Sequence, residues 1–373
     1  MKEIEIGRNK RGKRAYAFDD VAIVPTRRTR DPEDVSTSWS IDAYEFRMPV
    51  VAAPMDSVVS PSTAIQIGKL GGLGVLDLEG LWTRYDDPEK LLIEISKLPE
   101  SEATARMQQI YSEPIKPELI RDRLAEIRAG GVTVAGALSP QRTAQFSDVV
   151  LKAGVDLFVI RGTTVSAEHV AKKTEALNLK QFIYELDVPV IVGGVANYTA
   201  ALHLMRTGAA GVLVGFGGGA ASTTRAVLGI HAPMASAVAD VAGARRDYMD
   251  ESGGRYVHVI ADGGIGTSGD IVKAISLGAD AVMIGSILAR AKEAPGKGWH
   301  WGQEAFHGQL PRGNRVFVGE SGSLEQILIG PSSSADGLTN IVGALARSMA
   351  TTGYSDLKEF QRVEVVVAPY QKS

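Results

Sequence analysis

The sequence predicts an α/β fold, a TIM barrel in which eight parallel strands close into one domain over residues 1–373. Three observations carry this prediction. Eight short apolar runs recur along the chain, and segments of helical length separate them. A short motif that begins with glycine leads into three of the runs. The length of 373 residues also suits a single barrel of this kind.

The expected strands are continuous apolar runs, without alternation of apolar and polar residues. This continuity is typical of a parallel strand that is buried on both faces. In chain order, the runs are 49–54, 73–78, 132–138, 156–160, 188–193, 211–215, 257–262 and 281–285. Helical patterns lie between them, and the clearest are 61–70, 117–129, 199–207 and 268–277. Because a strand count from one sequence is often off by one, an open α/β sheet is the alternative fold.

A weak internal repeat favours the closed barrel. In 154–160, 208–214 and 278–284, a glycine is followed by two or three mostly small or acidic residues and then by an apolar run. A glycine that ends a helix directly before a buried strand is expected at the junction of repeated βα units.

Two segments interrupt the regular alternation. Residues 79–131 are charged and helical in pattern, and they are too short and too poor in strands for a separate domain. Residues 294–334, after the eighth strand, are rich in Gly, Pro and Ser. Active-site flaps are often long irregular stretches at this end of a barrel. The chain then resumes a helix at 338–349 and closes with the apolar run 363–367.

Composition excludes several classes of protein. The 43 acidic and 40 basic residues nearly cancel, so we expect neither nucleic acid nor an anionic membrane as a partner. No apolar run approaches the roughly 20 residues that span a bilayer, and the charged N-terminal segment is unlike a secretory signal, so we expect a cytoplasmic protein. The absence of cysteine excludes disulfides, thiolate metal sites and a cysteine nucleophile.

The strongest local signal lies in the loops after the seventh and eighth strands. The segment ADGGI at 261–265 ends one strand, and Gly285 and Ser286 end the next. In a barrel these loops form the usual phosphate cradle, because glycine lets backbone N–H groups approach phosphate oxygens. Asp262 is placed to accept hydrogen bonds from ribose hydroxyls. The alternative is that the glycines only turn the chain, but their presence in two adjacent loops favours phosphate binding.

A second glycine-rich loop, GFGGGAASTTR at 215–225, follows the sixth strand. It lacks the Gly-Lys-Ser/Thr ending of a Walker loop, and its glycines indicate backbone that bends sharply or lies against a ligand or ion. Ser222 and Thr224 have helix capping as an alternative role. After the first strand, Met55 suits contact with a flat aromatic base, and core packing explains it equally well.

Five segments together resemble the IMP dehydrogenase/GMP reductase family. They are 16–25 (YAFDDVAIVP), 53–58 (APMDSV), 71–76 (GGLGVL), the 215–225 loop and 261–286 (ADGGIGTSGDIVKAISLGADAVMIGS). Their order and spacing match the family from about residue 16 onward. IMP dehydrogenases usually carry tandem CBS domains after the second strand, where this chain has only 79–131. The chain therefore resembles a compact branch without CBS domains.

The resemblance implies a homotetramer of TIM barrels that binds a purine nucleoside monophosphate, with IMP favoured, and NAD or NADP. In such enzymes a cysteine thiolate attacks purine carbon 2. The dehydrogenase then passes hydride to NAD and hydrolyses the adduct, whereas the reductase uses NADPH to deaminate GMP. The substrate positions carried over are Asp262 at the ribose, Gly264, Gly285 and Ser286 at the phosphate, Met55 and Thr224 at the base, and Gly263 as a further contact. The catalytic positions are Ser222 and Thr224, the cofactor positions are Arg161, Gly215, Phe216 and Gly217, and Gly217 and Gly219 border a monovalent cation.

The chain departs from the family pattern where the chemistry occurs. Ser222 stands at the position of the catalytic cysteine, and Ala220 and Ala53 stand where serines are usual. Arg161 replaces an aspartate on the nicotinamide side, and Val195 replaces an asparagine, although Asn197 lies nearby. The segment Arg312-Gly313-Asn314 is a poor match to the Arg-Tyr motif of the flap.

These replacements bear on the reaction. A thiol titrates at about pH 8.5 and is easily shifted to thiolate, whereas serine needs an adjacent base. The sequence thus supports nucleotide binding better than covalent chemistry at Ser222. It leaves two alternatives to an active oxidoreductase, a nucleotide-binding regulatory paralogue and a flavin-dependent oxidase. We expect Arg161 to disfavour the nicotinamide cation and to attract a phosphate.

Overall fold

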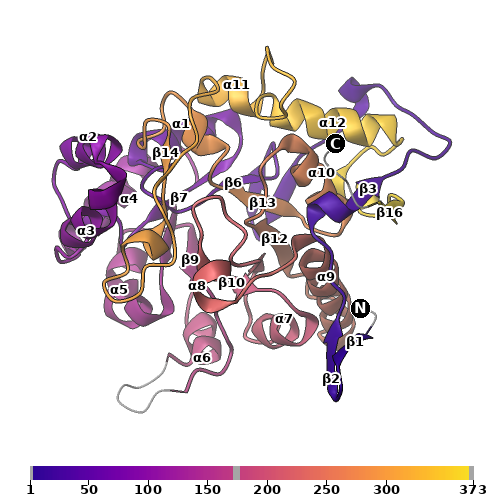
Figure 1. The fold of residues 1–373 in the computed structure, drawn as a ribbon, viewed down its shortest axis with the longest axis horizontal. Coiled ribbons are helices and arrows are strands. Elements are labelled where there is room, and N and C mark those ends of the chain that lie inside the picture. Colours follow the sequence, from indigo (N-terminus) through magenta and orange to yellow (C-terminus); the bar gives the residue numbers. More distant parts are fainter. Residues whose placement is uncertain (1–2, 171–176, 369–373) are drawn as a thin grey trace.

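The chain folds into a closed barrel of eight parallel strands (Figure 1). The computed structural model describes residues 3–170 and 177–368. Around the barrel the strands follow the order of the sequence, and β13 closes it against β6. The strands are β6 Val50–Ala52, β7 Leu73–Asp77, β8 Ala135–Leu138, β9 Leu157–Arg161, β10 Val190–Val195, β11 Gly211–Val214, β12 His258–Asp262 and β13 Ala281–Ile284. All eight overlap the predicted runs, although β10 lies two residues later than its run, so the barrel is confirmed and the open sheet is wrong.

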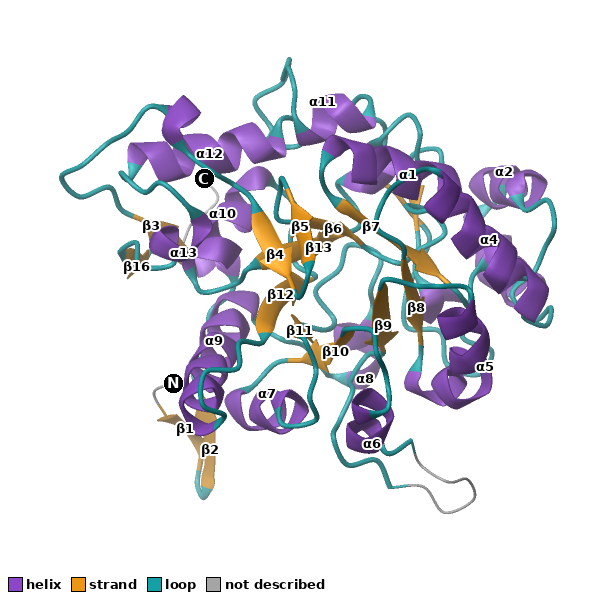
Figure 2. Cartoon of the chain, turned by 180° about the vertical axis from the view of Figure 1, so that it is seen from behind, coloured by secondary structure: helices purple, strands orange, loops and turns teal. Residues whose placement is uncertain are grey.

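Helices surround the barrel on its outside (Figure 2). They are α1 Pro61–Leu70, α4 Pro117–Ala129, α5 Pro140–Lys152, α6 Leu179–Tyr184, α7 Tyr198–Met205, α9 Met234–Glu251 and α10 Ser268–Ser276. Helices α1 and α4 have the predicted bounds, and α7 and α10 agree with theirs to within two residues. Local signals explain this accuracy in α1, because Ser60 accepts a hydrogen bond from the backbone N–H of Thr63 and Gly71 ends the helix at φ 102°.

The repeated glycines lie where the sequence predicts them. Gly154, Gly208 and Gly278 connect α5, α7 and α10 to the next strands, with φ of 79°, 97° and 112°. Only glycine adopts this left-handed conformation readily. At Gly278 a Cβ atom would also lie 2.5 Å from the Cβ of Ala242, so α9 packs there at a distance that excludes a side chain.

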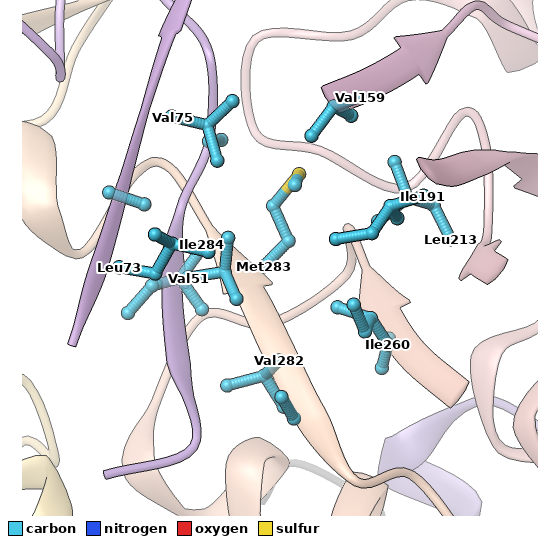
Figure 3. Packing of buried hydrophobic residues seen from close by; sticks show 14 of the residues in the cluster. Val51, Leu73, Val75, Val159, Ile191, Leu213, Ile260, Val282, Met283 and Ile284 are labelled. Carbon is cyan, nitrogen blue, oxygen red and sulfur yellow. The ribbon is translucent and has the colours of Figure 1, made fainter. Parts of the chain in front are cut away.

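Buried apolar side chains of the strands pack together at the barrel (Figure 3), and those at alternate positions of each strand fill its interior. Register explains which residues point inward, because parallel neighbours in register face the same side. Val51 pairs with Met283 and Leu73, and Val159 pairs with Ile191. These side chains are at most 1% exposed. Burial of each contributes about 1.5–3 kcal/mol to folding, and the filled interior leaves the strand ends as the place for a ligand.

Short strand pairs lie outside the barrel sheet. The hairpin of β4 Trp39–Ile41 and β5 Tyr44–Phe46 covers its N-terminal end, where the Trp39 ring lies edge-on to His258. Strand β3 Val21–Ile23 pairs with β16 Val365–Val367, within the predicted closing run. Strands β1 Glu3–Gly7 and β2 Lys10–Lys13 form an exposed hairpin beside α9 (Figure 1).

The two interrupting segments are more ordered than the sequence indicates. Before α4, the first segment forms α2 Glu89–Lys97 and α3 Glu100–Ile110. The second, 294–334, contains the strand pair β14 Trp299–His300 and β15 Val316–Phe317, the short helix η5 Gln303–Phe306, and α11 Leu324–Leu328. The next helix, α12 Ile341–Thr351, begins three residues later than predicted, because Asn340 has a left-handed φ of 51°. In the described part of the chain, no helix is both long and apolar enough to cross a membrane.

A buried charge cluster stabilises the N-terminal end of the barrel. Asp280 accepts hydrogen bonds from Arg245 at 2.8 Å, Lys358 at 2.5 Å and the Tyr256 hydroxyl at 2.7 Å. Burial opposes ionisation of this carboxyl, but Arg245 and Lys358 outweigh burial and hold the pKa of Asp280 below its usual value. Asp280 is therefore ionised in the folded protein, and its partners depend on that charge.

We expect Asp280→Asn to lower the free energy of unfolding by about 3 kcal/mol or more, because it leaves the nearly buried Arg245 guanidinium without a counter-charge. Urea denaturation followed by circular dichroism measures this loss. The matched control is Asp148→Asn, which removes an exposed carboxylate paired with Lys152 at 3.8 Å and should cost less than about 1 kcal/mol. Equal losses in the two variants would contradict a stabilising role for the cluster.

Candidate active site

A cavity of about 350 Å³ opens at the carboxyl ends of the barrel strands. Its volume lies within the range of sites that hold small molecules. The predicted site residues that line it are Met55, Arg161, Gly215, Phe216, Gly217, Gly219, Ser222, Asp262, Gly263, Gly264, Gly285 and Ser286. Thr224 is buried behind Ser222 and does not line the cavity. The structure thus gathers twelve of the thirteen predicted positions around one space.

The loops after β12 and β13 have the backbone geometry of an anion site. Gly263 and Gly264 have φ of 96° and 69°, which glycine adopts at little cost. Among the described residues, the backbone N–H groups of Gly264, Gly285 and Ser286 donate to no protein acceptor. Nearby, Asp270 organises the start of α10 by accepting hydrogen bonds from the N–H groups of Gly266 and Thr267, both at 3.0 Å.

Arg161 and Asp262 form an ion pair across the mouth of the barrel. Strand register explains their meeting, because Arg161 is level with Gly193, and both Arg161 and Asp262 occupy inward positions at their strand ends. Arg161 Nε donates to Asp262 Oδ2 at 3.0 Å. Burial lowers the pKa of Arg161, but Asp262 and Glu304 outweigh burial, so the guanidinium stays charged. The sequence singled out both residues and missed their pairing.

Glycines let the backbone pack closely beside this ion pair. Strands β10 and β11 lie between β9 and β12, and both have glycine near the mouth. A Cβ atom on Gly215 would lie 2.3 Å from the backbone oxygen of Asp262. A Cβ atom on Gly194 would lie 2.4 Å from the backbone oxygen of Gly215. Both positions therefore exclude any side chain, and the mouth between Arg161 and Asp262 is walled by bare backbone.

Ser222 is engaged with the helix that follows it. Its Oγ donates to Thr224 Oγ1 at 3.1 Å and accepts from the Thr224 backbone N–H at 3.3 Å. Thr224 is the first residue of α8 Thr224–Leu228, so Ser222 satisfies a free N–H at the start of this helix. Within the described residues, no carboxylate or imidazole is hydrogen-bonded to Ser222. A serine in this state is not activated as a nucleophile.

The segment 312–314 lies over the loop that carries Ser222. Gly313 forms an isolated antiparallel bridge with Ser222, and the N–H of Thr223 donates to the backbone oxygen of Arg312 at 2.8 Å. Arg312 Nη2 also donates to Thr163 Oγ1 at 3.0 Å. The segment 312–314, which matches the flap motif poorly, thus lies at the rim of the cavity.

Two cavity residues of the flap segment, His300 and Glu304, escaped the sequence analysis. His300 is 2% exposed, and its Nδ1 lies 3.1 Å from Ser57 Oγ. Burial, with a smaller effect of Arg290, lowers the pKa of His300 to about 4, so the imidazole is neutral. No motif surrounds either residue. Their position in the predicted flap was the one signal available.

A buried polar chain fastens the flap to the barrel. Ser57 Oγ contacts the backbone of Trp301, and Trp301 Nε1 donates to the Tyr111 hydroxyl at 2.9 Å. Tyr111 in turn donates to Asp56 Oδ2 at 2.7 Å. Burial raises the pKa of Asp56 to about 6, even though Leu81 and Tyr111 donate hydrogen bonds to it.

The segment 79–131 supports the same flap from outside. The Tyr111 ring, at the end of α3, stacks on Phe306 with 3.4 Å between ring centroids. Arg315 donates to the backbone oxygens of Ile95 and Leu98 at the end of α2. The helices α2 and α3 therefore form a platform on which the flap rests.

The protein is a TIM barrel with glycine loops after its seventh and eighth strands, the place where barrels of this class frequently bind phosphate. The sequence model of the IMP dehydrogenase / GMP reductase domain matches residues 15–309. The chain belongs to the IMP dehydrogenase/GMP reductase family.

Relatives and a solved structure agree with this assignment. An uncharacterized oxidoreductase of Mycolicibacterium smegmatis is 53% identical over 98% of this chain and 99% of its own length. An inosine-5′-monophosphate dehydrogenase of Methanocaldococcus jannaschii is 28% identical over 76% of this chain and 74% of its own length. The crystal structure of an IMP dehydrogenase/GMP reductase-like protein from Corynebacterium glutamicum has a TM-score of 0.93 and 48% identity, covering 98% of this chain and 97% of that one.

The raised pKa of Asp56 predicts a pH-dependent stability. Asp56 is fully buried, so the folded protein favours its protonated, neutral form. The stability gained in this way is complete below the unfolded pKa of about 4 and is lost as the pH rises through the folded pKa of about 6. Wild type should therefore lose about 3 kcal/mol more than Asp56→Asn between pH 4 and pH 7. Chemical denaturation across this range measures the difference. Parallel pH profiles for the two proteins would contradict it.

Proposed function

We propose that this chain is an oxidoreductase that acts on a purine nucleoside monophosphate, IMP in the first place, with NAD or NADP. The glycine cradle after β12 and β13 carries the proposal. The free N–H groups of Gly264, Gly285 and Ser286 suit phosphate oxygens, and family membership gives the cradle its ligand class. Membership in the IMP dehydrogenase/GMP reductase family also disfavours the third alternative, a flavin-dependent oxidase.

The other parts of the nucleotide follow from the cradle. Arg161 donates a hydrogen bond to Asp262 Oδ2. The other carboxylate oxygen, Oδ1, would accept a hydrogen bond from a ribose hydroxyl, with Gly263 beside it. Met55 lines the cavity on the side of Gly285 and would flank the base. Together these residues hold the phosphate, the sugar and the base in one orientation, which is the main contribution a protein makes to a reaction carried by a cofactor.

The nicotinamide cofactor would lie along the 215–219 loop. Gly215, Phe216 and Gly217 line the cavity, beside Arg161 and Gly162. The nicotinamide, when bound, supplies the hydride acceptor or donor. Gly217 and Gly219 would offer backbone oxygens to a monovalent cation. As in the resemblance, we propose that the protein is a homotetramer of purine nucleotide metabolism in the cytoplasm.

One observation favours a second candidate, a nucleotide-binding paralogue that regulates an active enzyme. Ser222 stands at the nucleophile's position, and its hydroxyl is bonded to Thr224 rather than to a base. The two candidates share the cradle and differ only in turnover. Purified protein incubated with IMP and NAD, or with GMP and NADPH, and followed by the absorbance of the reduced nicotinamide, separates them.

Asp262→Asn should weaken IMP binding by about tenfold, because the amide is a poorer acceptor for a ribose hydroxyl and lacks the charge that orients Arg161. Isothermal titration calorimetry with IMP measures the change. Asp148→Asn, an exposed carboxylate on α5, serves as the control and should bind as wild type does. If wild type binds neither IMP nor GMP, both candidate functions are wrong.

Arg161→Gln should raise the affinity for NAD relative to NADH by several-fold. The guanidinium repels the oxidised, positively charged nicotinamide ring more than the neutral reduced ring, and glutamine removes that difference. Titration of each cofactor form into protein saturated with IMP gives the ratio. An unchanged ratio would show that Arg161 does not face the nicotinamide.

A further inference from the structure

His300 brings a neutral imidazole from the flap into the nucleotide cavity. A Cβ atom on Gly285 would lie 2.9 Å from His300 Cε1, 3.2 Å from His300 Nε2 and 3.1 Å from Met55 Sδ. The Cε1–Nε2 edge of the ring is therefore beside the end of β13 and close to Met55. The ring edge is thus next to Gly285 of the proposed cradle, on the side where Met55 also lies.

The contacts of Ser57 fix the tautomer of this ring. Ser57 Oγ lies 3.1 Å from the Trp301 backbone oxygen, 3.2 Å from the Trp301 backbone nitrogen and 3.1 Å from His300 Nδ1. A hydroxyl has one proton, and the carbonyl oxygen can only accept, so the proton of Ser57 goes to Trp301. All three contacts are satisfied only when His300 Nδ1 carries its own proton and donates to Ser57. Nε2 is then a lone-pair acceptor.

The Nε2 acceptor suits the hydroxyl or ring N–H groups of a nucleoside and does not suit the phosphate. Its lone pair is unfavourable beside phosphate oxygens, which carry negative charge and lone pairs of their own. It is favourable beside a hydroxyl or a ring N–H. Because the imidazole is neutral and held by Ser57, it keeps this acceptor in one orientation at no further ordering cost.

We infer that His300 determines nucleotide specificity by accepting, at Nε2, a hydrogen bond from a proton-bearing atom of the bound nucleoside, either the lactam N–H of a hypoxanthine or guanine ring or a ribose hydroxyl. The inference rests on the proposed function, because it requires a purine nucleotide in the cavity. It adds a recognition residue from the flap, so the flap takes part in choosing the ligand.

Two substitutions separate recognition from structural support. In His300→Asn, the amide reaches Ser57 and nothing reaches the cavity, whereas in His300→Gln the amide reaches the place of Nε2 and the contact with Ser57 is lost. We expect His300→Asn to weaken IMP binding by about tenfold and His300→Gln to bind IMP at least several-fold more tightly than His300→Asn. Calorimetry with IMP measures affinity, and thermal unfolding measures stability.

The outcomes are distinct. If His300 only supports the fold, the order of affinities reverses, with His300→Asn binding better than His300→Gln, and the inference is overturned. Wild-type affinity for IMP in His300→Asn overturns it while leaving the proposed function intact. If wild type binds neither IMP nor GMP, both fail together.

Nucleotide analogues identify the donor. Weaker wild-type binding of N1-methyl-IMP than of IMP, with no such difference in His300→Asn, identifies the base N–H. The same pattern with 2′-deoxy-IMP or 3′-deoxy-IMP identifies a sugar hydroxyl. If wild type binds all the analogues as tightly as IMP, no proton donor reaches Nε2 and the inference is overturned.

Discussion

The register of the closed barrel is the constraint on which the site depends. Each strand turns alternate side chains inward, and the last inward positions form the mouth. On β9 and β12 those positions are Arg161 and Asp262, and between them β10 and β11 have glycine near the mouth. A shift of one residue in any of these strands would turn the ion pair outward. The chemistry of the site is therefore tied to the packing of the core beneath it.

The flap is built into the barrel through polar groups that cannot reach water. Ser57, Trp301, Tyr111 and Asp56 form a continuous buried chain, and the segment 79–131 supplies the tyrosine. A buried polar group that lacks a hydrogen-bond partner costs folding free energy, whereas hydrogen bonds between buried groups hold them rigidly in place. The segment 79–131 thus has a structural role next to the cavity.

The parts of this structure that depend on short stretches of sequence could be predicted. Continuous apolar runs predicted all eight strands, and the glycines at 263, 264 and 285 line the cavity where the sequence placed a site, because both signals are local. The ion pair of Arg161 with Asp262 joins residues 101 positions apart and needs the register. His300 approaches Ser57 from 243 positions away, and its neighbours in the sequence form no motif. The roles of these residues in binding stay predictions.

The stack of Tyr111 on Phe306 has a kinetic consequence. An aromatic pair of this kind must separate before η5 can swing away from the cavity, so it adds a barrier to opening. The residence time of a bound molecule would then depend on a contact that never touches it. Exchange could be accelerated by loosening α3 alone, with little change in equilibrium affinity.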